Sequence, residues 1–283
     1  MKLIALDLDG TTFNSNKEIS KENIEAIKLA QAEGHKVMVL SGRALDEITP
    51  DLEKYGLHCP IGTNNGASIY INNQAVKMIT LEQEQIKAIT TEVEQEYIPY
   101  TVATNNGVYA PKDWFQRLEN MLPSSGTDKE ELEMYKAFAL AYGHQSFHHI
   151  HDLLNDATIQ IQKFFAFTID PIQKKRFEMF LNTIDGISIV STNTFIDIMH
   201  HQASKGNALQ FMAEYYQIPL KDTVAIGDEG NDISMFNIAG LAIAMGNARD
   251  QVKKHSDVVT LTNDEHGVAH AIHHYVLHET IKN

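Results

Sequence analysis

Short apolar runs that end in polar residues are the feature of this 283-residue chain that most constrains its fold. The first run, Lys2–Leu6, is almost entirely apolar, and Lys36–Leu40 repeats the pattern. A strand with apolar side chains on both faces must be covered on both faces, which is typical of a parallel sheet between two helical layers. The two runs therefore predict strands in the interior of an α/β sheet.

Helical patterns separate the predicted strands. Ser20 is the predicted N-cap of the first helix, and Pro50 interrupts or bends the second, Ala44–Tyr55. The alternation resumes in the last third of the chain. There we predict helices at Gly206–Tyr216, Ile233–Ala239, Ala248–His255 and Gly267–His278, and strands at Thr223–Ile226, Leu241–Ala244 and Val258–Leu261.

The middle of the chain follows a different pattern. Short strands with Gly and Asn turns, such as Asn64-Asn65-Gly66, are predicted from Pro60 to Thr80, and a mixture of hairpin, helices and strands follows to His200. We interpret residues 1–80 and 201–283 as one α/β core, a doubly wound, mostly parallel sheet of Rossmann-like type. Residues 81–200 are then an inserted α+β cap domain.

Composition excludes several classes of partner. The formal net charge is −14, from 23 basic and 37 acidic residues, whereas nucleic-acid binding requires a basic face. No stretch approaches the ~20 apolar residues that span a membrane, and the first residues offer no export signal. The single cysteine, Cys59, fits a reducing compartment. We expect a cytoplasmic protein that binds neither nucleic acid nor membrane, and its oligomeric state stays open.

Polar residues leave several predicted strands where sites form in parallel sheets, at the carboxyl ends. The segments that follow strands or the cap are Asp7-Leu8-Asp9-Gly10-Thr11, Ser41-Gly42-Arg43, Ser204-Lys205-Gly206 and Gly227-Asp228-Glu229-Gly230-Asn231-Asp232. All of them are therefore expected on one edge of the sheet.

The pair Asp7 and Asp9 is the start of the chemical interpretation. Two carboxylates this close repel each other unless a cation lies between them or one is protonated. Hard oxygen ligands at an edge open to water suit Mg²⁺, with Asp228 as a further ligand, and Gly10 permits the sharp turn. An isolated pattern of this kind is more often a solvated turn, but the shared edge with Asp228 and Asp232 weakens that interpretation.

Lys205 and Ser41 are candidates for phosphate binding. Lys205 stands just before a predicted helix, where the positive end of the helix dipole disfavours a cation, so a role in holding a phosphoryl oxygen explains it better than a solvated surface position. The Ser41 hydroxyl and the Gly42 N–H form a possible phosphate cradle. A role of Ser41 as the N-cap of the next helix is an equally good explanation. Arg43 could steer phosphate or pair with Asp46 or Glu47, and it stays unassigned.

These residues together suggest phosphoryl transfer. Asp7 would attack phosphorus and form an acyl phosphate, which splits a very slow hydrolysis into two easier steps. Asp9 would donate a proton to the leaving oxygen and then accept one from water. Mg²⁺ and Lys205 would neutralise the phosphoryl oxygens.

The motifs, in this order, resemble the haloacid dehalogenase superfamily and, within it, the Cof-like sugar-phosphatase group with a C2B cap. The resemblance rests on Asp7–Thr11 (DLDGT), Ser41, Lys205, Gly227-Asp228 with Asn231-Asp232, and Ala244-Met245-Gly246-Asn247-Ala248. It implies that the Asp7 carboxylate, the Asp9 backbone carbonyl and the Asp228 carboxylate bind the metal, and that Asp232 orients its water. It also implies that Asn231, Lys205, Ser41 and the backbone near Gly10 hold the phosphate.

The expected function is a Mg²⁺-dependent phosphatase of a small phosphorylated metabolite, such as a sugar phosphate. A phosphotransferase or phosphomutase with the same intermediate is the first alternative. A non-catalytic, phosphate-responsive binding module is the second alternative. In receiver modules, however, the phosphorylated Asp follows a middle strand and there is no large cap, whereas Asp7 follows the first strand.

Overall fold

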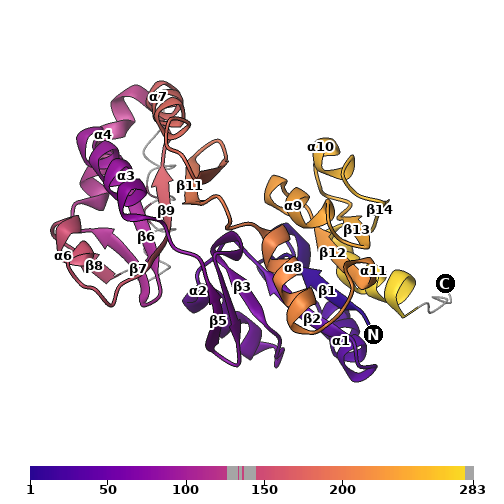
Figure 1. The fold of residues 1–283 in the computed structure, drawn as a ribbon. Helices are drawn as coiled ribbons and strands as arrows, with labels where there is room; N and C mark the ends of the chain where they lie inside the picture. The colour runs from indigo at the N-terminus through magenta and orange to yellow at the C-terminus, as the bar shows by residue number, and fades with distance from the viewer. Residues whose placement is uncertain (126–132, 134–135, 137–144, 278–283) are drawn as a thin grey trace. The chain divides into compact units, whose positions relative to one another are not determined.

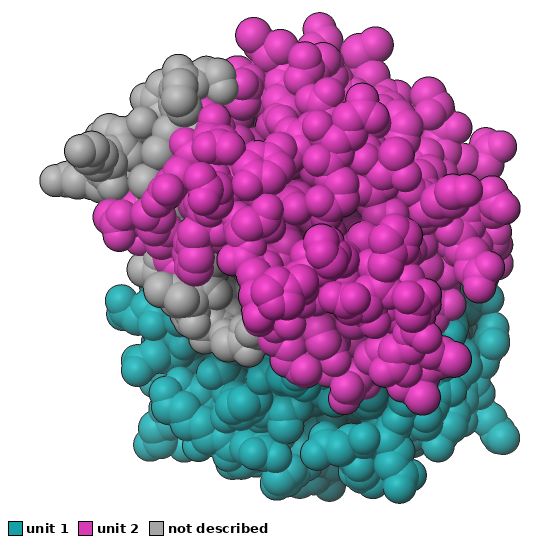
Figure 2. All heavy atoms as spheres, turned by 90° about the vertical axis from the view of Figure 1, so that its left-hand side faces the viewer, with its two compact units in different colours: residues 1–78, 203–283 teal, residues 79–202 magenta. Residues whose placement is uncertain are grey.

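The computed structural model describes residues 1–125, 133, 136 and 145–277. The chain forms two compact units, one of Met1–Met78 with Ala203–Asn283 and the other of Ile79–Gln202 (Figures 1 and 2). Since the first unit consists of two separate stretches, its sheet joins strands from both ends of the chain.

The first unit contains an eight-stranded sheet within the described residues. In spatial order its strands are β14 (Val258–Val259), β13 (Leu241–Ala244), β12 (Thr223–Gly227), β1 (Leu3–Leu6), β2 (Lys36–Leu40), β3 (Ile61–Thr63), β4 (Ser68–Ile71) and β5 (Gln74–Met78). The strands from β14 to β3 run parallel, and β4 and β5 are antiparallel additions. The predicted mostly parallel α/β sheet is confirmed.

Helices cover both faces of this sheet (Figure 1). Ile4 and Leu6 of β1 pack in one core cluster with residues of α1 (Lys21–Ala32), α2 (Leu45–Lys54) and α11 (Gly267–Ala271). The alternate residues Leu3 and Ala5 pack in the other cluster, with α8 (Lys205–Tyr215), α9 (Ile233–Phe236) and α10 (Asp250–Lys253). This division is the physical reason why β1 is apolar throughout.

Local signals in the sequence account for several helix ends. The Ser20 side chain accepts a hydrogen bond from Asn23 N at the start of α1, as predicted. Helix α2 continues through Pro50, so the interruption considered there is absent. The predicted last helix becomes α11 followed by a π-helical turn, Ile272–Val276, and its predicted end at His278 lies outside the described residues.

The second unit has its own six-stranded sheet within the described residues. The order is β10 (Ile187–Ser191), β11 (Phe195–His200), β9 (Ile161–Phe167), β6 (Tyr100–Thr104), β7 (Gly107–Pro111) and β8 (Gln145–Phe147). Its helices are α3 (Gln83–Gln95), α4 (Trp114–Ser125), α6 (Ile150–Leu154) and α7 (Pro171–Leu181). Strand β8 was not predicted, because three residues of mixed polarity carry no periodic signal.

A cluster of apolar side chains stabilises this second sheet. Tyr100 and Phe164 lie on neighbouring strands with their ring centroids 6.0 Å apart, and Phe177 of α7 packs in the same cluster. No helix among the described residues of either unit is long and apolar enough to cross a membrane.

The different burial of two leucine side chains in the first unit predicts that their replacement affects stability differently. Leu6 is fully buried and Leu261 is 42% exposed. Leu6→Ala should lower the free energy of unfolding by about 2–5 kcal/mol, because a cavity forms in the core. Leu261→Ala should cost less than half as much. Urea unfolding followed by circular dichroism measures both, and equal losses would contradict the core position of Leu6.

Candidate active site

Asp7 stands at the carboxyl end of the central strand β1. Its backbone N–H donates to Ile226 O of β12 at 3.0 Å, which continues the sheet pairing, and its side chain is buried. The tight turn Leu8–Thr12 follows, and Thr12 Oγ1 donates to Asp7 O at 2.5 Å. The turn therefore holds the Asp7 backbone at the edge of the sheet.

Gly10 lets this turn approach the neighbouring loop closely. It has a φ of +76°, and a Cβ atom there would lie 2.3 Å from Asp228 Oδ2. The adjacent Thr11 Oγ1 donates to Asp228 Oδ1 at 2.7 Å. A side chain at position 10 would push the Asp228 carboxylate out of place.

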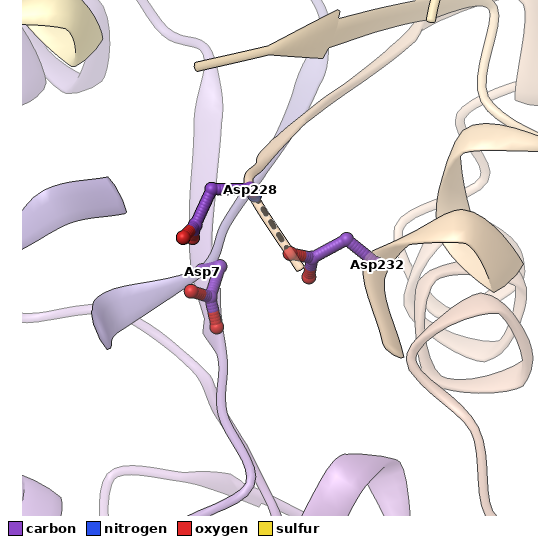
Figure 3. A group of neighbouring side chains, drawn as sticks. All are labelled: Asp7, Asp228 and Asp232. Carbon is purple, nitrogen blue, oxygen red and sulfur yellow. Dashed lines mark hydrogen bonds between the residues drawn. The ribbon is translucent and has the colours of Figure 1, made fainter. Parts of the chain in front are cut away.

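Asp228 and Asp232 come from the loop after β12, the strand beside β1. Asp232 Oδ2 accepts hydrogen bonds from the backbone N–H groups of Asp228 at 2.8 Å and Glu229 at 2.9 Å. Asp7, Asp228 and Asp232 each place a carboxylate oxygen within 4.8 Å of the others (Figure 3). The adjacent strands β1 and β12 thus bring Asp7 into one buried group with two acids that lie more than 200 positions later in the chain.

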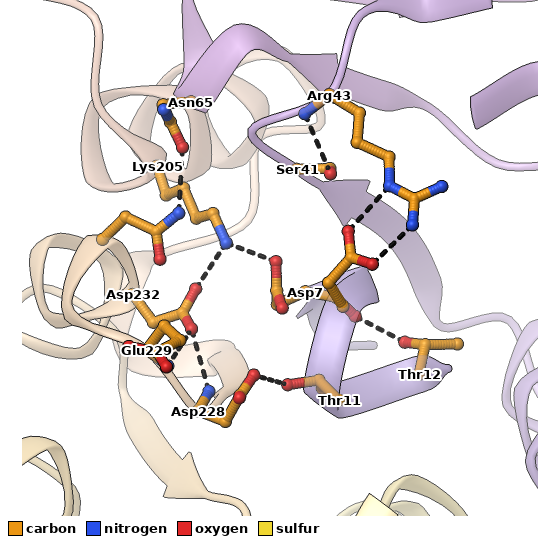
Figure 4. Close-up of polar contacts among 12 residues, drawn as sticks. Asp7, Thr11, Thr12, Ser41, Arg43, Asn65, Lys205, Asp228, Glu229 and Asp232 are labelled. Carbon is orange, nitrogen blue, oxygen red and sulfur yellow. Dashed lines mark hydrogen bonds and ion pairs between the residues drawn. The ribbon is translucent and has the colours of Figure 1, made fainter. Parts of the chain in front are cut away.

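Within the described part of the chain, Lys205 is the cation that contacts this group. Its Nζ donates to Asp7 Oδ1 and, at 2.6 Å, to Asp232 Oδ1 (Figure 4). Its side chain is fully buried, so the surface interpretation does not hold. Lys205 is the first residue of α8, so this helix begins one residue earlier than predicted. The side chain of Ser204 caps the helix by accepting a hydrogen bond from Asn207 N. The two carboxylates offset the unfavourable helix dipole.

Burial and the charges of neighbouring acids disfavour the charged forms of Asp7 and Asp228. Burial raises the pKa of Asp7 well above its ordinary value against the opposing effect of Lys205, and the charges of Asp232 and Asp228 raise it further. Burial also raises the pKa of Asp228 to about 6, although the hydrogen bond from Thr11 opposes this. Burial alone would lower the pKa of Lys205, but Asp232 and Asp7 raise it above its ordinary value.

The Asp9 carboxylate lies apart from the three buried acids. It accepts hydrogen bonds from Arg43 Nε at 2.7 Å, Arg43 Nη2 at 2.5 Å and Lys17 Nζ at 2.9 Å. Burial by itself raises the pKa of Asp9, but the hydrogen bonds and charges of Arg43 and Lys17 outweigh it and hold the pKa below the ordinary value. Two cations therefore lie beside Asp9, namely Lys17 and Arg43, and the sequence left Arg43 unassigned.

The loop after β2 holds Ser41 and Gly42. Ser41 Oγ accepts a hydrogen bond from Arg43 N at 3.2 Å. The N-cap of α2 is Ala44, whose N–H donates to Glu47 Oε2 at 2.8 Å, so Ser41 is not the N-cap. The close-up in Figure 4 draws Ser41 and Arg43 together with Asp7 and Lys205.

Asn231 contacts Asn65, which the sequence indicates only as part of a turn. Its Nδ2 donates to Asn65 Oδ1 at 2.9 Å. Asn65 is buried, and its only signal in the sequence is an Asn-Asn-Gly turn, which indicates a backbone conformation and not a site.

Comparison with known proteins identifies the family of the chain. The sequence profile of the haloacid dehalogenase-like hydrolases matches residues 4–272. Phosphatase YwpJ of Bacillus subtilis (strain 168) is 35% identical over 97% of this chain and 99% of its own. The 5-amino-6-(5-phospho-D-ribitylamino)uracil phosphatase YwtE of the same strain is 33% identical over 96% of this chain and 97% of its own. The solved structure of a haloacid dehalogenase-like hydrolase from B. subtilis superposes with a TM-score of 0.85 at 32% identity. The match covers 98% of this chain and 100% of that structure's chain.

The raised pKa of Asp228 predicts a pH effect on the metal-free protein. Because the folded state holds this proton more tightly than the unfolded state, Asp228 makes folding less favourable as pH rises from about 4 to about 7. In EDTA, Asp228→Asn should therefore reduce the fall in unfolding free energy across this range. Urea titrations at several pH values measure it, and parallel curves for the two proteins would contradict the assignment.

Proposed function

Because the chain belongs to the haloacid dehalogenase-like hydrolases, we propose that it hydrolyses a small phosphorylated metabolite through an aspartyl-phosphate on Asp7. The chain is a phosphoric monoester hydrolase, and the proposal concerns its mechanism and substrate. The observation that carries it is the buried Asp7 carboxylate, which Lys205 contacts directly and which lies within 4.8 Å of the carboxylate oxygens of Asp228 and Asp232.

The donor set fits a divalent cation. Three carboxylates gather with only Lys205 in hydrogen-bond contact as a counter-charge among the described residues, and burial opposes the ionisation of Asp7 and Asp228. Hard oxygen donors of this kind suit Mg²⁺. Asp7 and Asp228 would hold it with their carboxylates and Asp9 with its backbone carbonyl, while Asp232 would orient its water. When bound, the ion supplies positive charge to the phosphoryl oxygens.

Asp7 is the proposed nucleophile. Its carboxylate attacks phosphorus, the bond from phosphorus to the ester oxygen breaks, and water then cleaves the acyl phosphate. Lys205 holds Oδ1 of Asp7, so the carboxylate keeps one orientation, and the same ammonium group favours its charged form. The nucleophile is thereby oriented before substrate arrives.

Asp9 is the proposed acid and base. Arg43 and Lys17 favour its charged form, which is the form that accepts a proton from water in the second step. The first step requires the protonated form, since the leaving oxygen takes a proton. Substrate binding must therefore weaken at least one of these ion pairs.

The remaining residues would bind the phosphate. Ser41 Oγ accepts from Arg43 N, so its hydroxyl hydrogen can be donated to a phosphate oxygen. The Gly42 N–H and the backbone near Gly10 would add donors. Asn231 uses one N–H on Asn65, and its second is available for a phosphate oxygen.

The second unit is the proposed cap that selects the substrate. A small phosphorylated metabolite, such as a sugar phosphate, agrees with the names of the relatives, and a phosphoribityl compound of the YwtE type belongs in the test set. A phosphotransferase or phosphomutase shares the intermediate. It would release little phosphate unless an acceptor sugar is present, and a non-catalytic module would release none.

A panel of phosphorylated metabolites tests the mechanism. The protein should release orthophosphate from at least one member with Mg²⁺ and not with EDTA. Asp7→Asn should lower turnover by about a thousandfold or more, because no covalent intermediate forms. Asp250→Asn changes an exposed carboxylate of the same unit and should leave turnover unchanged. Full turnover by Asp7→Asn would exclude the mechanism.

Metal binding has a readout that does not depend on turnover. Mg²⁺ at a hundredfold excess over its Kd should stabilise the protein by about 2.7 kcal/mol, because it binds the folded state only. Asp228→Asn removes one proposed ligand and should abolish most of the Mg²⁺-induced rise in Tm. Thermal unfolding with and without Mg²⁺ measures the difference. An equal rise in both proteins would place the ion elsewhere.

A further inference from the structure

Three consecutive residues after β3 adopt left-handed backbone conformations. The φ angles are +50° at Asn64, +58° at Asn65 and +91° at Gly66. Asn tolerates this region better than most residues, but such a run persists only where the surroundings hold it. The sequence explains why a turn forms at residues 64–66, whereas the packing around the turn explains why all three residues keep left-handed conformations.

The surroundings are the loops proposed to bind phosphate. Asn64 N donates to Arg43 O and Asn65 N donates to Ser41 O, each at 2.9 Å. On the other side, a Cβ atom at Gly66 would lie 2.3 Å from Ser204 O, next to Lys205. The turn 64–66 therefore packs between the loop 41–43 and the start of helix α8, all within the first unit.

The Asn65 side chain joins two of the proposed phosphate ligands. Its Oδ1 accepts from Asn231 Nδ2 at 2.9 Å and lies 3.2 Å from where a Cβ atom of Gly42 would stand. Asn231 Oδ1 is buried without a hydrogen-bond partner among the described residues, so the contact with Asn65 determines which way its amide faces. The N–H₂ group faces Asn65, and one of its two hydrogens stays available.

We propose that Asn65 is a positioning residue for phosphate binding: it orients the Asn231 amide and holds the loop 41–43 so that both donate to one phosphate group. This inference rests on the proposed function, because Asn231 and the loop 41–43 are phosphate ligands only if that function holds. Because Asn65 would act through groups that hold the phosphate, its effect should fall on binding and not on the chemical step.

Glycine is the informative replacement. Asn65→Gly removes the side chain while keeping the left-handed backbone available. Asn73→Gly is the matched control, because Asn73 also has a positive φ, +62°, but lies exposed in the β4–β5 hairpin. Any general effect of placing Gly at a left-handed position should appear in both proteins.

Steady-state kinetics and orthophosphate binding by calorimetry test the proposal. Asn65→Gly should raise KM and the Kd of orthophosphate about tenfold with kcat within about threefold, as expected for loss of uniform binding. Asn73→Gly should change neither. Asn65→Gly behaviour equal to the control, or a fall in kcat alone, would overturn the proposal.

A double-mutant cycle tests the route through Asn231. If Asn65 acts by orienting that amide, Asn65→Gly should add little to the KM of Asn231→Ala, whereas fully additive effects would overturn the proposal. Asn65→Asp is a second variant that tolerates the same backbone. Its negative charge next to the proposed phosphate ligands should weaken orthophosphate binding, and unchanged binding would contradict the proposal.

The two hypotheses fail differently. If Asp7→Asn abolishes turnover and Asn65→Gly matches Asn73→Gly, the function stands and the role of Asn65 is refuted. If the unaltered protein hydrolyses no panel member, the proposed function fails, and the role of Asn65 stands only if the protein still binds orthophosphate and Asn65→Gly, unlike Asn73→Gly, weakens that binding.

Discussion

The ion pairs of Lys205 hold the site together. A buried ammonium group lies between Asp7, from the first strand, and Asp232, from a loop near the other end of the chain. Removing a charge from water costs several kcal/mol, and partners of opposite charge recover that cost only when they are close and well oriented. The two halves of the core must therefore meet in one register before Lys205 has both of its partners.

Three carboxylates for one lysine is a poor arrangement for stability alone. The raised pKa values of Asp7 and Asp228 indicate that burial and repulsion oppose the charged forms. Stability would favour fewer acids at this edge, so the excess of negative charge is better explained by a ligand that supplies positive charge. In the proposed function a divalent cation does so, and the incoming phosphate then meets a less negative site despite the net charge of −14.

Close backbone approach makes this concentration of charge possible. Gly10 lets the first loop reach Asp228, and Gly66 lets the left-handed turn reach the start of α8. Each contact joins segments that are distant in the chain. Arg43 contributes separately, because its pairing with Asp9 keeps that carboxylate out of the buried group. Two kinds of acid thus coexist, three in the buried group and one partly exposed beside cations.

The sequence by itself determined the fold class, the strands β1, β2 and β13 and the family. Apolar runs buried on both faces can form only interior strands, and the carboxyl ends of parallel neighbours share an edge, so the acids after β1 and β12 were expected together. Only the tertiary structure decided how the side chains pair. Arg43 meets Asp9 across 34 positions, Asn65 meets Asn231 across 166, and Lys205 meets Asp7 across 198. Such contacts depend on the side-chain conformations and backbone turns of two distant segments at once, and no periodicity along the chain records them.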